Sequence, residues 1–117
     1  MYQSLVVLFS LICRVAAGSG LNRKITHMLY MVIEHFNAGA APQIYRRARE
    51  HGRMLPQGLE YVSSWVDLQF HTCFQLMRTD DPALFAVWAE TWKDLASFEI
   101  VPVRTSAEAA EIMATEQ

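Results

Sequence analysis

Residues 62–77, VSSWVDLQFHTCFQLM, bring several chemically capable side chains close together along the chain. If this segment forms a hairpin, Asp67 can orient His71, giving an imidazole that moves a proton near neutral pH. The same two residues at a hairpin tip could instead form an exposed ion pair, which contributes little to stability. His71 and Asp67 are therefore candidate catalytic residues, and His35, which belongs to an earlier segment, is the third candidate.

The two halves of this hairpin also predict a binding cleft. If a short turn at residues 68–70 joins them, Trp65 lies opposite Cys73 and Ser63 lies opposite Gln75, on one side of a sheet. A mostly apolar cleft with a few hydrogen-bonding groups is typical of a small-molecule site. The alternative is ordinary packing, in which Trp65 and Cys73 are core residues. A one-residue change in register would move one strand's side chains to the other face.

Two further residues are candidates for the same cleft. Arg53 is a candidate anion contact, and Trp88 is a candidate ring wall. Trp88 and Trp92 are four residues apart on a predicted helix face, a spacing that is more typical of core packing than of a stacking platform. Cys73 lies in an apolar strand without a neighbouring base, so we do not expect it to be a nucleophile.

Charge and motif patterns argue against several classes of function. No H-x-x-x-H or C-x-x-C spacing occurs, so we predict no metal site. No G-x-G-x-x-G or Walker-type loop occurs either, and we therefore expect no cofactor. A net charge of -2 gives no long-range attraction to nucleic acids or anionic membranes, and the basic segment YRRARE is typical of a solvated helix face. We expect neither nucleic acid nor a membrane as a partner.

The first 27 residues differ in character from the rest of the chain. They contain an apolar run at 5–13 that is shorter than the roughly 20 residues needed to span a bilayer. Residues 15–17, VAA, fit the cleavage site of a signal peptide, although no basic residue precedes the apolar run and Arg14 follows it. A signal peptide is therefore one interpretation of this segment.

The other interpretation is that Met28 is the working start, because a complete domain pattern begins there. We expect residues 1–27 to be an N-terminal extension and residues 28–117 to form one domain. Cys73 is the only cysteine in that domain, so no internal disulfide is available and nothing argues for an oxidising compartment. We therefore expect a cytoplasmic location, or export if residues 1–17 are a signal peptide.

Strand-like and helix-like blocks alternate from residue 28 onward. Strands are predicted at 28–36, 59–68, 71–78 and 97–103. One helix is predicted from Pro42 to near Gly52 and a second from Pro82 through Leu95. A third helix is predicted after a T-x-x-E capping box at 105–108. This α+β order, βαββαβ plus a C-terminal helix, predicts a ferredoxin-like domain with two helices on one face of an antiparallel sheet. The strands are apolar on both sides, so we expect a second copy to cover the other face in a homodimer.

Three separated blocks resemble a known family. The segments GRMLPQGLEYVSSW, CFQLMRTDDPALFAVW and FEIVPVRTSAEAAE are similar to the family catalogued as domain of unknown function 3303, and the resemblance covers nearly all of residues 28–117. It implies a ferredoxin-like, dimeric α/β-barrel fold, which small monooxygenases, muconolactone isomerase-like enzymes and YCII-related proteins also use. It implies no established activity. Arg78 stands where the family would lead us to expect an acidic residue.

Two functions of different classes remain open. In the first, a small apolar or aromatic molecule binds between sheet and helices, with or without a cofactor-independent monooxygenase- or isomerase-like activity. In the second, the domain is a non-catalytic dimeric structural or interaction module. Likeness of fold does little to separate them. The candidate ligand-binding residues are Trp65, Cys73, Gln75, Trp88 and Arg53.

Overall fold

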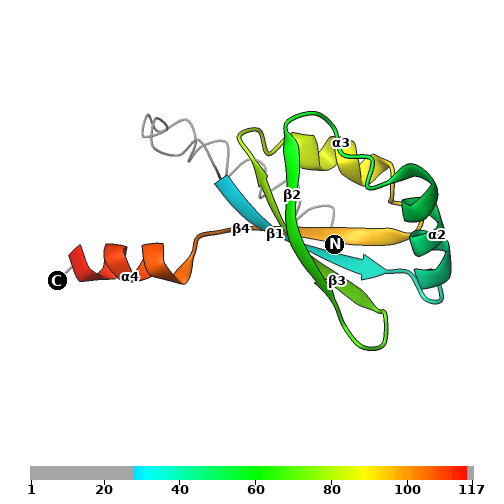
Figure 1. The fold of residues 1–117 in the computed structure, drawn as a ribbon, viewed down its shortest axis with the longest axis horizontal. Coiled ribbons are helices and arrows are strands. Elements are labelled where there is room, and N and C mark those ends of the chain that lie inside the picture. The colour runs from blue at the N-terminus through cyan, green and yellow to red at the C-terminus, as the bar shows by residue number, and fades with distance from the viewer. Residues whose placement is uncertain (1–27, 116–117) are drawn as a thin grey trace.

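The computed structural model describes residues 28–115, which form a four-stranded antiparallel sheet and three helices in the predicted order (Figure 1). The strands are β1 (Met28–Phe36), β2 (Leu59–Val66), β3 (Thr72–Thr79) and β4 (Ala96–Val103). The helices are α2 (Ala41–His51), α3 (Leu84–Glu90) and α4 (Ser106–Thr115). The α+β, ferredoxin-like fold class is thus confirmed. The predictions for residues 1–27 lie outside the described residues.

The sheet has the order β2-β3-β1-β4, with every neighbouring pair antiparallel. β1 is an inner strand, and Met31 at its middle lies between Leu76 of β3 and Val101 of β4. β4 is an edge strand, as Pro102 predicts. Proline has no N–H group to donate to a neighbouring strand, so within sheets it is found mainly in edge strands.

Local signals set the helix ends. α2 has a proline in its first turn and ends at Gly52, whose φ of 70° suits glycine and whose N–H donates to Ala48 O. α3 was expected to continue through Leu95, and this is wrong because the helix ends at Glu90. The N–H groups of Trp92 and Leu95 each bond three residues back, to Ala89 O and Trp92 O, so the chain continues as tight turns.

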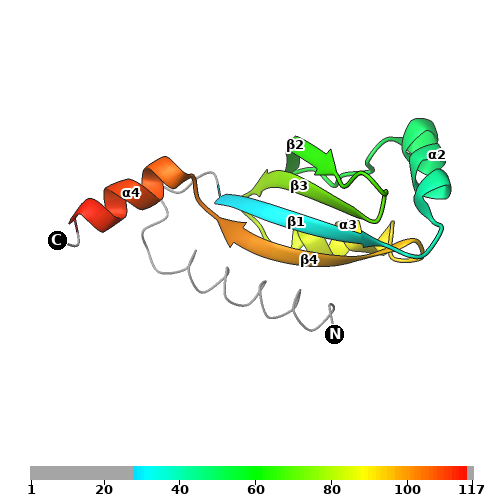
Figure 2. The same cartoon turned by 90° about the horizontal axis from the view of Figure 1, so that it is seen from below.

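The predicted capping box at the start of α4 is confirmed. The Glu108 N–H donates to Thr105 Oγ1 at 3.1 Å, and the Thr105 N–H donates to Glu108 Oε1 at 3.1 Å. α4 has no buried residue and extends away from the sheet, as Figure 2 shows. None of the helices in residues 28–115 is long and apolar enough to cross a membrane.

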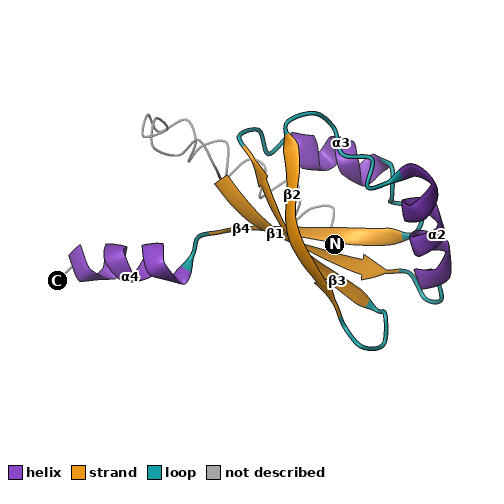
Figure 3. Cartoon of the chain, viewed as in Figure 1, coloured by secondary structure: helices purple, strands orange, loops and turns teal. Residues whose placement is uncertain are grey.

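The hydrophobic core lies on the sheet face that carries α2 and α3 (Figures 2 and 3). Alternate residues of β1, Tyr30 and Val32, point into this core and are almost completely buried. Tyr30 meets Phe85 of α3 in a T-shaped contact with ring centroids 5.0 Å apart. Because strand side chains alternate, Glu34 also faces this side of the sheet.

The opposite side, which we call the open sheet face, carries apolar side chains that no described helix covers. Its apolar residues are Leu29, Met31, Ile33, Trp65, Phe74, Leu76, Val101 and Val103. Trp65 is 57% exposed and Phe74 is 38% exposed. The prediction that the strands are apolar on both faces is therefore confirmed.

The register of the β2–β3 hairpin differs from the predicted one. Trp65 pairs with Phe74, and Ser64 pairs with Gln75, so the predicted pairs of Trp65 with Cys73 and of Ser63 with Gln75 are wrong. The physical reason is that His71 belongs to the loop, since its N–H donates to the Asp67 carboxylate at 2.6 Å. Trp65 therefore lies on the open sheet face, opposite the core.

An irregularity between Tyr61 and Ser63 restores the expected register at the far end of the hairpin. Val62 is the extra residue of this bulge, so Tyr61 pairs with Met77 and Leu59 pairs with Thr79. The bulge keeps Leu59 in the core while Ser64 and Cys73 share the inner face near the turn.

Candidate functional site

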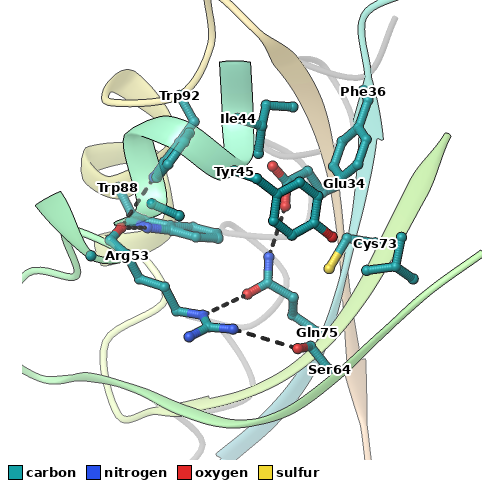
Figure 4. A pocket seen from close by; sticks show the side chains of 13 residues that line it. Glu34, Phe36, Ile44, Tyr45, Arg53, Ser64, Cys73, Gln75, Trp88 and Trp92 are labelled. Atoms are coloured by element: carbon teal, nitrogen blue, oxygen red, sulfur yellow. Dashed lines mark hydrogen bonds between the residues drawn. The ribbon is translucent and has the colours of Figure 1, made fainter. Parts of the chain in front are cut away.

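A cavity of about 200 Å³ lies between the inner sheet face and helices α2 and α3, and it opens to solvent (Figure 4). The sheet contributes Glu34, Cys73 and Gln75 to its wall. Tyr45 comes from α2 and Trp88 from α3. The wall thus combines aromatic surface with a few polar groups, the composition expected of a small-molecule site.

Glu34 is the most unusual group in the cavity. It is the only buried acidic residue in residues 28–115, with 6% of the residue exposed. Its Oε1 accepts a hydrogen bond from Gln75 Nε2 at 2.9 Å. Burial raises the pKa of Glu34 from 4.5 to about 7, and the Gln75 hydrogen bond and the positive charge of Arg53 only partly oppose this. Both protonation states of Glu34 are therefore populated near neutral pH.

Glu34 is not among the site residues predicted from the sequence. The available signal was its position on the same side of β1 as Tyr30 and Val32, where a carboxyl group is rare. A buried carboxyl of this kind requires either a partner or a function.

Gln75 connects Glu34 to Arg53. Its Nε2 donates to Glu34, and its Oε1 accepts from Arg53 Nε at 3.5 Å, the long end of the hydrogen-bonding range. Only 4% of Gln75 is exposed, so both ends of the amide are used inside the protein. Figure 4 shows this line of three side chains across the cavity.

Two tryptophans anchor the backbone of Arg53. Trp88 Nε1 and Trp92 Nε1 both donate to the carbonyl oxygen of Arg53, at 2.8 and 3.1 Å. The spacing of four residues thus brings two indole N–H groups to one acceptor, and both rings also belong to the core. The guanidinium of Arg53 lies 3.6 Å from the ring centroid of Tyr61 and bonds Ser64 Oγ at 3.5 Å.

The thiol of Cys73 is free and buried. Burial, and secondly the negative charge of Glu34, raises the pKa of Cys73 to about 12. The thiol therefore stays protonated near neutral pH, and it forms part of the cavity wall without being an activated nucleophile.

An aromatic rim borders the cavity on the side of α2. Tyr45 contacts Phe36 at 6.5 Å and Phe70 at 6.2 Å between ring centroids, in both cases edge to face. Phe70 comes from the tip of the β2–β3 hairpin, is 55% exposed and has a φ of 60°. The hairpin loop therefore extends the apolar rim formed by Phe36 and Tyr45.

The structure brings together four of the predicted site residues, Arg53, Cys73, Gln75 and Trp88, at one cavity. Trp65 does not line this cavity, because the register places it on the other side of the sheet. The cavity wall therefore lacks Trp65 and contains Glu34 and Tyr45, which were not among the predicted ligand-binding residues.

The three candidate catalytic residues are not at the cavity. His35 lies on the open sheet face, with its Nε2 3.3 Å from Glu99 Oε1. The Asp67 carboxylate accepts hydrogen bonds from the backbone N–H groups of Thr72 and His71, which lower its pKa. These bonds make Asp67 a turn-forming residue. Within residues 28–115, no group of three His, Cys, Asp or Glu side chains is placed to hold a metal ion.

A search of curated proteins and a search of solved structures each found no match to this chain. Residues 28–117 match a family described as Domain of unknown function (DUF3303), which covers all four strands and all three helices described above. The chain therefore belongs to the DUF3303 family.

Proposed function

We propose that the protein binds a small, mostly apolar molecule in this cavity and that Glu34 exchanges a proton with it. The observation that carries the proposal is the buried carboxyl of Glu34, which stands at a solvent-open cavity beside aromatic walls. With its pKa raised to about 7, Glu34 has the protonation behaviour that a general acid and base needs near neutral pH.

Proton transfer of this kind supports an isomerase-like reaction. The Glu34 carboxylic acid would give its proton to one carbon of an enol-type ligand, and the resulting carboxylate would take the proton from the enol oxygen, which leaves the keto form and restores the acid. No oxidant or reductant is consumed, so one acid–base group completes the cycle. This makes isomerisation the better-supported alternative to the monooxygenase-like activity expected from the resemblance.

Tryptophan fluorescence offers a direct test of ligand binding. The chain has three tryptophans, and Trp88 and Trp92 border the cavity, while Trp65 lies on the other face. In a Trp65→Phe background, titration with neutral and acidic one-ring aromatic compounds should change the fluorescence saturably, because both remaining indoles report on the cavity.

A cavity-filling variant provides the specificity control. Ala48 lines the cavity from α2, so Ala48→Leu should weaken binding at least about tenfold, while Ala86→Leu on the exposed side of α3 should not change it. If no compound alters the fluorescence, or if Ala48→Leu leaves binding unchanged, the cavity is not a ligand site. The non-catalytic module would then be the better assignment.

The open sheet face favours a second role, homodimerisation, which is compatible with the first. Its apolar centre is flanked by polar pairs, Arg78 with Glu60 and His35 with Glu99, and an apolar centre with a polar rim is typical of an interface. We propose that a second copy of this chain covers the face around a two-fold axis. Trp65 would then be an assembly residue.

A further inference from the structure

We infer that the cavity takes a one-ring organic acid in its anionic form, with the carboxylate of the ligand on Arg53, and that a proton enters with it. This inference deepens the proposed function, and it rests on the cavity being a small-molecule site. Three features of the described residues support it: the charge at Arg53, the size of the cavity, and the connection from Arg53 to Glu34.

Among the arginines of residues 28–115 whose side chains form hydrogen bonds, Arg53 is the one without a carboxylate partner. Arg47 forms two hydrogen bonds with the Asp94 carboxylate, at 2.9 and 2.7 Å, and Arg78 bonds Glu60 at 3.1 Å. Within residues 28–115, no carboxylate forms an ion pair with Arg53, whose two side-chain hydrogen bonds are both 3.5 Å long and go to uncharged groups.

The Arg53 guanidinium is nevertheless held in place. It lies on the Tyr61 ring, and its backbone carbonyl is fixed by Trp88 and Trp92. A positioned guanidinium that lines a cavity and has no ionic partner is suited to bind a carboxylate through two parallel N–H···O bonds.

The volume of the cavity limits the ligand to about one ring. A cavity of about 150 Å³ in another protein holds benzene, so about 200 Å³ leaves space for one ring with a small substituent. The walls supply aromatic contacts from Tyr45 and Trp88. A ring that packs between these side chains can place its carboxylate toward Arg53 and its remaining atoms toward Glu34.

The entry of the proton follows from the same geometry. Gln75 links Arg53 to Glu34, and the positive charge of Arg53 favours the ionised form of Glu34. A bound carboxylate offsets that charge and so removes its support for the ionised form, which raises the pKa of Glu34 further and makes Glu34 take up a proton. The other titratable groups facing Glu34 are Tyr45 from α2 and Cys73 from β3, whose pKa values are both raised, so both are neutral near pH 7.

Among residues 28–115, the remaining elements place only uncharged side chains toward Glu34. α3 and the turn that follows it present Trp88 and Trp92, and β4 places Phe98 opposite Glu34. Arg53 is therefore the charge through which a ligand anion acts on Glu34.

The test uses benzoate and its uncharged counterpart benzamide as probes, with full-length protein in the Trp65→Phe background. At pH 6, benzoate should bind at least about tenfold more tightly than benzamide. Between pH 7 and 8.5, benzoate binding should weaken by up to about tenfold per pH unit, because Glu34 is protonated in the benzoate complex and is increasingly ionised in the free protein as the pH rises. Benzamide binding should stay constant over the same range.

Three variants separate the parts of the inference. Arg53→Gln should abolish the preference for benzoate, while Arg49→Gln, on the exposed side of α2, should retain it. Glu34→Gln should keep the preference and remove the pH dependence. Benzamide binding that equals benzoate binding, and that Ala48→Leu weakens, would overturn the anion inference and leave the proposed function standing.

Two other results also count against the inference. A preference for benzoate that shows no change between pH 7 and 8.5 would overturn the entry of the proton. If neither probe binds and none of the wider set of one-ring compounds binds, both the inference and the proposed function are wrong.

Discussion

Replacing Glu34 by glutamine is expected to stabilise the protein by about 3 kcal/mol at pH 8, and by less than about 1 kcal/mol at pH 5. Glutamine has nearly the same shape and carries no charge, so it removes the cost of ionising a buried carboxyl. Urea unfolding at the two pH values measures the difference directly.

The direction follows from the raised pKa of Glu34. The folded protein binds the proton up to about pH 7, whereas the unfolded chain releases it near 4.5. The stabilising contribution of Glu34 is therefore fully present below pH 4.5, and it is lost as the pH rises to about 7. At 1.36 kcal/mol per pH unit, this interval corresponds to a loss of about 3 kcal/mol in the wild type.

The matched control is Glu111→Gln, which changes an exposed glutamate on α4. Its free energy of unfolding should follow that of the wild type at both pH values. If Glu34→Gln increased the free energy of unfolding equally at pH 5 and pH 8, or decreased it at pH 8, Glu34 would not be a carboxyl with a strongly raised pKa. A buried carboxyl that costs stability at the wall of a cavity fits a functional role.

Replacing Met31 by glutamate is expected to convert the proposed homodimer into a folded monomer. Met31 lies at the middle of the open sheet face, between Leu76 and Val101. An unpaired carboxylate buried there costs roughly 3 kcal/mol, and two-fold symmetry places it in the interface twice. The dissociation constant of the dimer should rise by about four orders of magnitude.

Light scattering after size exclusion reports the mass, and circular dichroism shows whether the monomer is folded. Folding should be retained because Met31 is only partly buried and lies outside the hydrophobic core. Val87→Glu, at an exposed apolar position of α3, is the matched control and should stay dimeric. A monomeric wild type, or a dimeric Met31→Glu protein, would rule out the proposed interface.

Periodic signals allowed the sheet and helices to be predicted from the sequence. The alternation in β1 correctly separates Met31 from Tyr30 and Val32, because side chains on a strand repeat every two residues. The capping box at Thr105 depends only on residues within one helical turn, so it too was visible in the sequence.

The features that the sequence did not reveal depend on contacts without periodicity. The hairpin register depends on the hydrogen bonds of Asp67 to its loop and on the bulge at Val62, and either one shifts the pairing by one residue. Glu34 was missed as a site residue for a related reason. The pKa of Glu34 is raised by burial, and Gln75 and Arg53 partly oppose this. The side chains that bury Glu34, like Gln75 and Arg53, are far from it in the sequence and meet it only in the folded protein.

The pKa of Glu34 tests the central claim most directly. Carbon-13 NMR of the side-chain carboxyl groups, in protein labelled at glutamate, can follow each glutamate between pH 4 and 9, and the Glu34→Gln variant assigns the signal. The proposed site predicts that this signal titrates near pH 7 and moves to higher pH when benzoate is added. A Glu34 signal that titrates near the ordinary value of 4.5, with or without benzoate, would contradict the account.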